Sequence, residues 1–155
     1  MILQNLDELI KSLIKRFSKI PEERKELLNT FAAHISQKIT NGKEVNLNFI
    51  CTHNSRRSHM CQIWAQTSAS YYNIPNIRCY SGGTDATAFN QRSVNAVRSV
   101  GFKVEQLDNN ENSRYSVKFS ENQDPLICFS KKYDDEFNPS SDFTAIMTCS
   151  HADEN

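Results

Sequence analysis

A cysteine, an arginine and a serine at Cys51, Arg57 and Ser58 have the types and spacing needed for chemistry on a tetrahedral oxyanion. The alternating apolar residues of the segment 45–50 predict a buried strand that ends at Cys51, and a helical pattern follows Arg57. The N–H groups of the short loop and the helix dipole would bind an anion, and a guanidinium binds two of its oxygens. The same positive field favours a thiolate, so we expect Cys51 to be a nucleophile.

The bulk composition excludes several classes of protein. A chain of 155 residues suits one domain with a hydrophobic core. Its 18 basic and 18 acidic residues give a net charge of zero, which argues against a general nucleic-acid binder. No apolar run approaches the roughly 20 residues of a membrane span, and the N-terminus has no signal-peptide pattern. We therefore expect a cytoplasmic protein with no membrane or nucleic-acid partner.

The cysteines indicate free thiols in a reducing compartment. Their number is odd and no Cys-x-x-Cys pair occurs, which argues against a zinc site or a thioredoxin motif, so we expect no metal. Cys61, Cys79 and Cys128 fall within predicted elements and are expected to be packing residues. Cys51 and Cys149 instead fall at the ends of predicted strands.

Two helices are predicted before the first strand. Residues 3–18 have apolar side chains at helical spacing, and Pro21 suits the first position of a second helix. The Asn-Gly pair at 41–42 predicts the end of that helix. We interpret residues 1–42 as a helical hairpin packed on the core, and residues 43–155 as an α/β domain. The hairpin is either plain scaffold or a surface for a partner or for self-association.

Strands and helices alternate after residue 43, which predicts an α/β fold with a mostly parallel sheet covered by helices in three layers. Ligands of such sheets bind at the carboxyl ends of the strands, where Cys51 and Cys149 fall. The polar segment 131–142 is expected to be a solvated connection, and 81–84 a turn. The predicted strands are 45–51, 77–81, 102–107, 115–120, 126–130 and a buried strand at 144–149, and the predicted helices are 57–72 and 90–100.

The segment 51–58, Cys-Thr-His-Asn-Ser-Arg-Arg-Ser, resembles the phosphate-binding loop of the low-molecular-weight protein tyrosine phosphatase superfamily. That superfamily includes the thioredoxin-coupled arsenate reductases. The resemblance covers residues 45–155 and implies a flavodoxin-like fold of the phosphatase type. Supporting segments follow in the family's order at 81–84 (Ser-Gly-Gly-Thr), 90–97, 130–132 (Ser-Lys-Lys) and 148–155, the last resembling the arsenate reductase branch.

The resemblance implies a role for each residue of the loop. Cys51 is the nucleophile, Arg57 stabilises charge in the transition state, and Ser58 donates a hydrogen bond to the thiolate. Asn54 braces the loop. His53 stands where the family usually has glycine, and Arg56 where many members have a second loop cysteine. The implied oxyanion-binding residues are Thr52, His53, Asn54, Ser55, Arg56 and Arg57.

The favoured reading is an arsenate reductase in which Cys51 attacks arsenate and Cys149 is the second thiol. Such an enzyme has no bound cofactor and uses thioredoxin or a similar thiol reductant. One alternative is a phosphatase acting on phosphotyrosine through a phosphocysteine at Cys51. That reaction needs a general acid, and Asp124-Pro125, the only Asp-Pro pair, is expected to be a turn. A further alternative is a non-catalytic module that binds an oxyanion or a phosphoprotein.

The reductase branch has a third cysteine a few residues after the second. The chain ends at Asn155, close to where that cysteine would fall. We therefore interpret the sequence as one cut short, with a general acid or a third thiol beyond its end.

Overall fold

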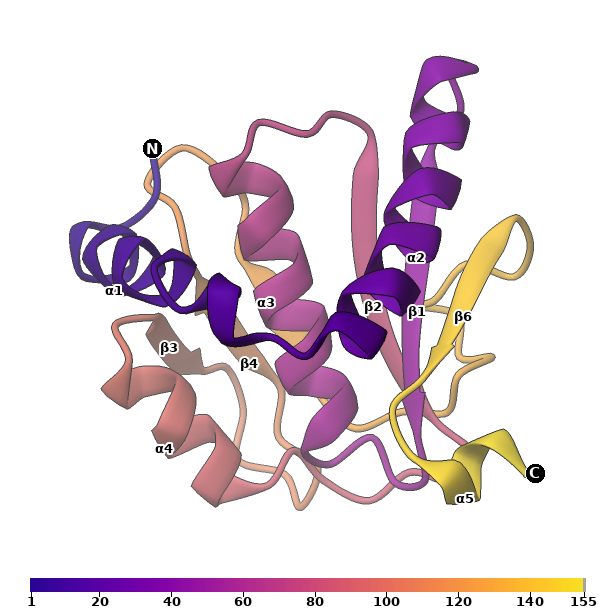
Figure 1. Ribbon diagram of the computed structural model, residues 1–155. Helices are drawn as coiled ribbons and strands as arrows, with labels where there is room; N and C mark the ends of the chain where they lie inside the picture. The colour runs from indigo at the N-terminus through magenta and orange to yellow at the C-terminus, as the bar shows by residue number, and fades with distance from the viewer. Residues whose placement is uncertain (155) are drawn as a thin grey trace.

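A parallel sheet with strand order β2–β1–β6 positions the predicted loop in the computed structural model, which describes residues 1–154 (Figure 1). The central strand β1 (Val45–Cys51) pairs with β2 (Ile77–Gly83) and with β6 (Phe143–Met147). Every residue of β1 except Asn46 is buried, in keeping with the predicted buried strand. The predicted α/β class is thus confirmed: a parallel sheet is flanked by helices, and the arrangement is compatible with a flavodoxin-like fold.

Helix α3 (Arg57–Tyr71) follows the loop and lies between two hydrophobic clusters. Its bounds agree with the predicted helix to within one residue. Ile63 belongs to one cluster, while Cys61 and Ala65 pack against β1 in the other. His59 is fully buried, stacks on Phe89 with 4.1 Å between ring centroids, and its Nε2 lies 3.1 Å from a backbone carbonyl oxygen. Burial lowers the pKa of His59 to about 3, so this side chain is neutral.

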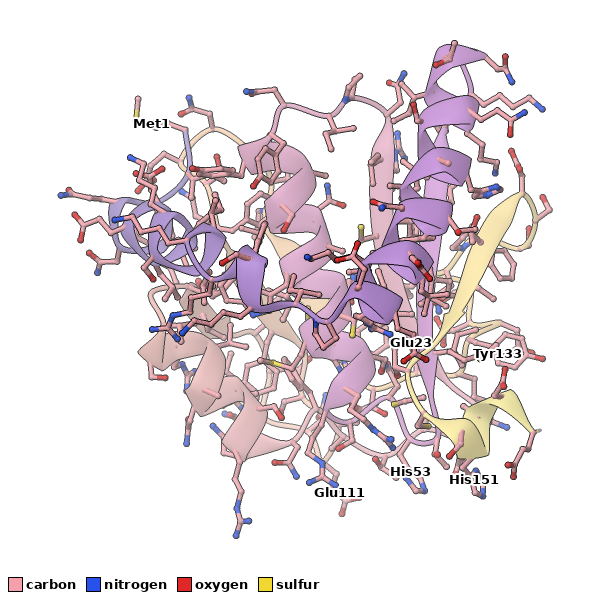
Figure 2. The ribbon with its side chains drawn as sticks, viewed as in Figure 1. Met1, Glu23, His53, Glu111, Tyr133 and His151 are labelled. Carbon is pink, nitrogen blue, oxygen red and sulfur yellow. The ribbon has the colours of Figure 1, made fainter. Side chains whose placement is uncertain are left out.

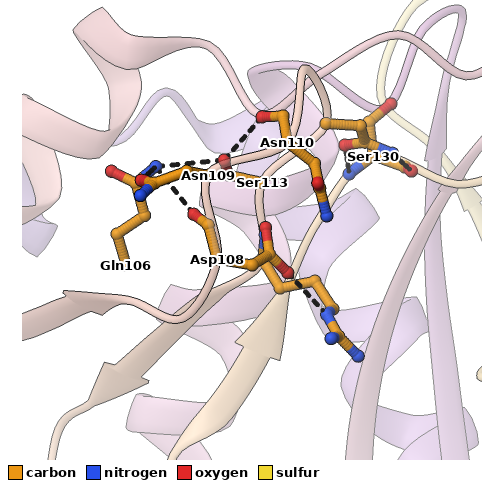
Figure 3. Close-up of polar contacts among 8 residues, drawn as sticks. Gln106, Asp108, Asn109, Asn110, Ser113 and Ser130 are labelled. Atoms are coloured by element: carbon orange, nitrogen blue, oxygen red, sulfur yellow. Dashed lines mark hydrogen bonds and ion pairs between the residues drawn. The ribbon is translucent and has the colours of Figure 1, made fainter.

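The predicted parallel sheet is confirmed for β1, β2 and β6 but does not include the other three strands. β3 (Lys103–Gln106), β4 (Tyr115–Lys118) and β5 (Leu126–Cys128) form a separate antiparallel sheet. The reason is the length of the connections, because parallel neighbours need a crossover of a dozen or more residues, usually a helix. The β3–β4 connection is instead a turn braced by Gln106, which donates to Ser113 Oγ over 3.0 Å (Figure 3).

The two N-terminal helices do not form the predicted hairpin. Helix α1 (Gln4–Ile14) packs through Leu6 on the cluster that contains the antiparallel sheet, and a short 3₁₀ turn, η1 (Phe17–Lys19), follows it. Helix α2 (Glu22–Thr40) packs on β1 instead (Figure 1). The apolar faces of the two helices cover different clusters, so they separate. Within residues 1–154, no helix has the length and apolar character needed to cross a membrane.

The helix ends follow local sequence signals, with one small correction. Pro21 is the residue that precedes α2 rather than its first helical position. Gly42 has a φ of +68°, in keeping with the predicted stop after α2. Helix α4 (Gln91–Ser99) is capped by the Asn90 side chain, which accepts from a backbone N–H over 3.0 Å, and Gly101 follows it with a φ of +109°.

Three further expectations are corrected by the structure. The segment 81–84 is not a free turn, because β2 continues through Gly83. Strand β6 is only partly buried, since it lies at the edge of the described sheet, and it ends before Cys149. The segment 131–142 is not fully solvated: Lys131 and Asn138 are buried. Asn138 donates to a backbone oxygen of β2 over 3.1 Å, which fastens this segment to the sheet.

Candidate oxyanion site

The thiol of Cys51 lies at the centre of the loop between β1 and α3. The side chain is only 3% exposed, and its Sγ lies 3.1 Å from the hydroxyl oxygen of Ser58. Burial alone would raise the pKa of Cys51, but the Ser58 hydroxyl and the backbone N–H groups of Ser58, Ser55 and Asn54 outweigh it. The pKa of Cys51 is therefore lowered. Loop N–H groups that converge on one sulfur favour a thiolate, and they can also hold the oxygens of a bound anion.

Asn54 fixes the direction of the Ser58 hydrogen bond. Its Oδ1 accepts from the backbone N–H of Lys131 over 3.0 Å, so its Nδ2 faces Ser58 and donates to that hydroxyl oxygen over 2.8 Å. The Ser58 oxygen therefore acts as an acceptor toward Asn54, and its single hydrogen is free to point at Cys51. A hydrogen bond donated to the charged form stabilises a thiolate.

The unusual backbone conformation of the loop is at Asn54 and not at His53, where the resemblance suggested it. Asn54, not His53, takes the left-handed conformation, with a φ of +43°. Asparagine tolerates this region better than most residues. His53 has no positive φ, and its carbonyl oxygen accepts from Ser130 Oγ over 2.8 Å.

The end of β2 holds the loop from one side. The backbone N–H groups of Thr84 and Asp85 donate to the carbonyl oxygens of Cys51 and Thr52 over 3.0 and 2.8 Å. A Cβ added to Gly83 would lie 2.7 Å from the Asn54 nitrogen and 2.8 Å from the Thr52 oxygen. Only glycine permits this approach, which explains why the second glycine of the Ser-Gly-Gly-Thr segment, Gly83, has no side chain.

Segments distant in sequence hold the loop from the other side. Ser130 donates to His53 and accepts from the backbone N–H of Thr87 over 2.8 Å. Asn112, in the turn between β3 and β4, donates to the Ser130 carbonyl oxygen over 2.7 Å and accepts from its N–H over 3.0 Å. The antiparallel sheet thus supports the loop through Ser130. The role of Asn112 was not predicted, because only the fold brings it to residue 130.

Cys149, the predicted second thiol, lies beside the loop. It follows β6 and immediately precedes the short helix α5 (Ser150–Asp153). Its partly exposed Sγ lies 3.6 Å from Thr52 Oγ1. Burial would raise the pKa of Cys149, but the Thr52 side chain, the N–H groups of Ala152 and Thr52 and the charge of Arg57 outweigh it and lower the pKa. Figure 2 shows His53, from the loop, and His151, from α5, at the same end of the parallel sheet.

The predicted site residues differ in their exposure to solvent. A groove of about 1080 Å³ opens beside the loop, and its lining includes the loop residues Arg56 and Arg57 together with Cys149. The buried members are the predicted nucleophile and the residues that brace it, whereas the charged members are at the surface. Cys51, Asn54 and Ser58 are buried, Thr52 and Ser55 are partly buried, and His53, Arg56 and Arg57 are exposed.

The other cysteines have the environment of packing residues. Cys79 and Cys128 are buried, and burial raises the pKa of each to about 12. Cys61 is partly buried, and burial and the charge of Cys51 raise its pKa. Asp124-Pro125 lies in the connection that leads into β5, in keeping with the predicted turn. The lowered pKa values thus distinguish Cys51 and Cys149 from the other three thiols.

Replacing Ser58 with alanine should move the alkylation of Cys51 to higher pH. The Ser58 hydroxyl lowers the pKa of Cys51, so its loss raises that pKa and leaves less thiolate at pH 7. The pH profile of iodoacetamide alkylation at Cys51, read by mass spectrometry, measures the change. Ser12→Ala, on the exposed face of α1, is the matched control. An unchanged alkylation profile in Ser58→Ala would contradict this role of the hydroxyl.

No known protein family, curated protein or solved structure matches this chain. The geometry of the loop and of Cys149 is therefore the basis for assigning a functional class.

Proposed function

We propose that this protein is a thiol-dependent arsenate reductase built on a fold of the low-molecular-weight phosphatase type. One observation carries the proposal: a second thiol with a lowered pKa, Cys149, lies 3.6 Å from the side chain of Thr52, the residue that follows Cys51 in a loop whose N–H groups converge on the Cys51 sulfur. A phosphatase needs the first thiol and the loop but has no use for the second. A reductase needs both, because two electrons must come from a pair of thiols.

The first step forms a bond between Cys51 and arsenic. The loop N–H groups and Arg57 hold the arsenate oxygens, and the Cys51 thiolate attacks the arsenic atom. A hydroxyl group of arsenate takes up a proton from solvent and leaves as water. The product is a thiol ester of arsenate at Cys51, and arsenic is still in its +5 state.

The second step reduces the arsenic. The Cys149 thiolate attacks the sulfur of Cys51, a disulfide forms between the two cysteines, and the sulfur–arsenic bond breaks. The electron pair of that bond stays on arsenic, which leaves as arsenite in the +3 state. The partly exposed position of Cys149 beside Thr52 suits this attack. A thioredoxin-type dithiol then reduces the disulfide, and no bound cofactor is needed.

Three assays distinguish this function from its two alternatives. Arsenate-dependent oxidation of NADPH, with thioredoxin and thioredoxin reductase present, supports the reductase. Hydrolysis of p-nitrophenyl phosphate without that oxidation supports the phosphatase. Phosphate binding with neither activity supports a binding module. Either of the last two results would overturn the proposal.

Replacing Cys149 with serine should lower the rate of arsenate reduction at least about 10³-fold, because it removes one of the two electron-donating thiols. Phosphate binding, measured by calorimetry, should be retained because the Cys51 loop is intact. Cys61→Ser is the matched control: it removes a partly buried thiol that packs against β1, and it should retain most of the activity. A Cys149→Ser enzyme that still reduces arsenate at a rate within tenfold of wild type would contradict the assigned second thiol.

A further inference from the structure

Helix α2, which lies outside the resemblance to the phosphatase superfamily, forms one wall of the groove that contains Cys149. Its N-terminal half contributes Arg24, Leu27 and Leu28, and the opposite wall runs from Ile146 to Ser150. Figure 1 shows α2 in front of the parallel sheet, and Figure 2 shows Glu23 at the end of α2 that is nearer the loop. The groove therefore combines the thiol chemistry of the loop with a surface supplied by α2.

The surface of this groove is both apolar and basic. Leu27, Leu28 and Met147 are 59%, 41% and 41% exposed, although they are large hydrophobic side chains. The charged side chains that line the groove are Arg24, Arg56, Arg57 and a single acid, Asp153. The chain as a whole has a net charge of zero, so this excess of positive charge is local. An apolar patch bordered by positive charge fits a protein surface with apolar and acidic residues.

The two cysteines are unequally accessible from the groove. Cys51 is 3% exposed, whereas Cys149 is partly exposed and lines the groove. A thiolate held on a protein surface therefore reaches the sulfur of Cys149 more readily than that of Cys51, whereas small molecules can still enter the loop. The converging N–H groups also make Cys51 the better leaving group, because a stabilised thiolate leaves faster.

We propose that this groove docks a protein dithiol with an apolar and acidic border against Leu27, Leu28 and Arg24, and that the dithiol attacks Cys149. The proposal rests on the proposed reductase function and deepens it by naming the docking surface and the attacked sulfur. A small thiol needs no contact with α2 to reach Cys149, so substitutions on the helix should mainly affect a protein reductant.

The exchange balances in two steps. One thiolate of the partner attacks the sulfur of Cys149, the Cys51–Cys149 disulfide breaks, and Cys51 leaves as a thiolate. The partner's second thiol loses its proton and attacks the partner's own sulfur, which releases the Cys149 thiolate. The partner gives up two electrons and becomes a disulfide, and the enzyme returns to its dithiol state.

The first test compares two reductants on one enzyme. In the Leu27→Glu/Leu28→Glu variant, the ratio of the thioredoxin-supported to the dithiothreitol-supported rate of arsenate reduction should fall at least about tenfold, since acidic residues in the patch repel an acidic border. Arg24→Glu should lower the ratio in the same direction. Leu107→Glu and Arg92→Glu, exposed residues outside the groove, should leave it unchanged. The dithiothreitol rate also shows that each variant is folded.

The second test identifies the attacked sulfur. Thioredoxin that lacks its second active-site cysteine should trap a mixed disulfide with the oxidised enzyme, and peptide mass spectrometry should place the link at Cys149. A link at Cys51, or an unchanged ratio in the α2 variants, would overturn the docking proposal while leaving the reductase function intact. Release of arsenite in a single turnover of the reduced enzyme tests that function separately, and its absence would overturn both.

Discussion

Replacing Cys51 with serine should lower the rate of arsenate reduction, or of p-nitrophenyl phosphate hydrolysis, at least about 10⁴-fold. A hydroxyl has a pKa far above that of a thiol, so the N–H groups that favour a thiolate at this position do not yield an alkoxide at neutral pH. Serine differs from cysteine by one atom and keeps a polar contact with Ser58, which lies 3.1 Å from the present sulfur. We therefore expect the chemistry to be lost and the fold to be retained.

Phosphate binding separates loss of chemistry from loss of structure in this variant. The thiolate repels a bound anion, so an uncharged serine should bind phosphate as tightly as the wild type or more tightly. Calorimetric titration with inorganic phosphate measures this affinity, and thermal unfolding checks the fold. A Cys51→Ser protein that binds phosphate and keeps more than a tenth of the wild-type activity would show that Cys51 is not the nucleophile.

The parts of the site that are local in sequence were predictable. The alternation of residues 45–50 places Cys51 at a strand end, and the helical pattern after residue 57 places Arg57 and Ser58 at a helix N-terminus. Both features depend on periodicities that act over a few residues. The structure therefore agrees with the predicted bounds of β1 and α3.

The parts that depend on long-range pairing were not predictable in the same way. The register of β3, β4 and β5 is set by short connections and by cross-strand packing, so apolar alternation shows that a strand exists but not its partner. The packing position of α2 depends on which hydrophobic cluster its apolar face contacts. Asn54 and Lys131 are 77 positions apart in the sequence, yet they form a hydrogen bond. Both residues belong to the short segments of the resemblance, but that resemblance does not show that the segments are in contact.

Gly83 shows where a sequence signal was present but misread. A Gly-Gly pair after a strand is typical of a turn, so the sequence predicts that Gly82 and Gly83 lie in a connection. The structure instead has Gly83 within β2, where its missing Cβ admits the backbone of Asn54 and Thr52. Glycine within a strand can mark a close approach of another backbone, and here that backbone is the loop.

Replacing Asn54 with alanine should lower the free energy of unfolding by about 3–8 kcal/mol, because three effects act together. The buried N–H of Lys131 and the Ser58 hydroxyl each lose a hydrogen-bond partner, at about 1–3 kcal/mol each. Alanine also takes the left-handed conformation, with a φ of +43°, at a cost of about 1–2 kcal/mol. The loop should lose the geometry that orients Ser58, so kcat/KM should fall about 10²-fold.

Glycine and aspartate at the same position separate these effects. Asn54→Gly removes both hydrogen bonds but relieves the backbone strain, so it should be about 1 kcal/mol more stable than Asn54→Ala. Asn54→Asp keeps an acceptor for Lys131 but places a carboxylate near the thiolate, which should raise the pKa of Cys51 and move its alkylation to higher pH. Urea unfolding and the pH profile of iodoacetamide alkylation measure the two effects independently. Suppose that the free energy of unfolding of Asn54→Ala lies within 1 kcal/mol of the wild-type value and that the alkylation profile of Cys51 is unchanged. Asn54 then neither braces the loop nor orients Ser58, and the loop N–H groups alone must stabilise the thiolate.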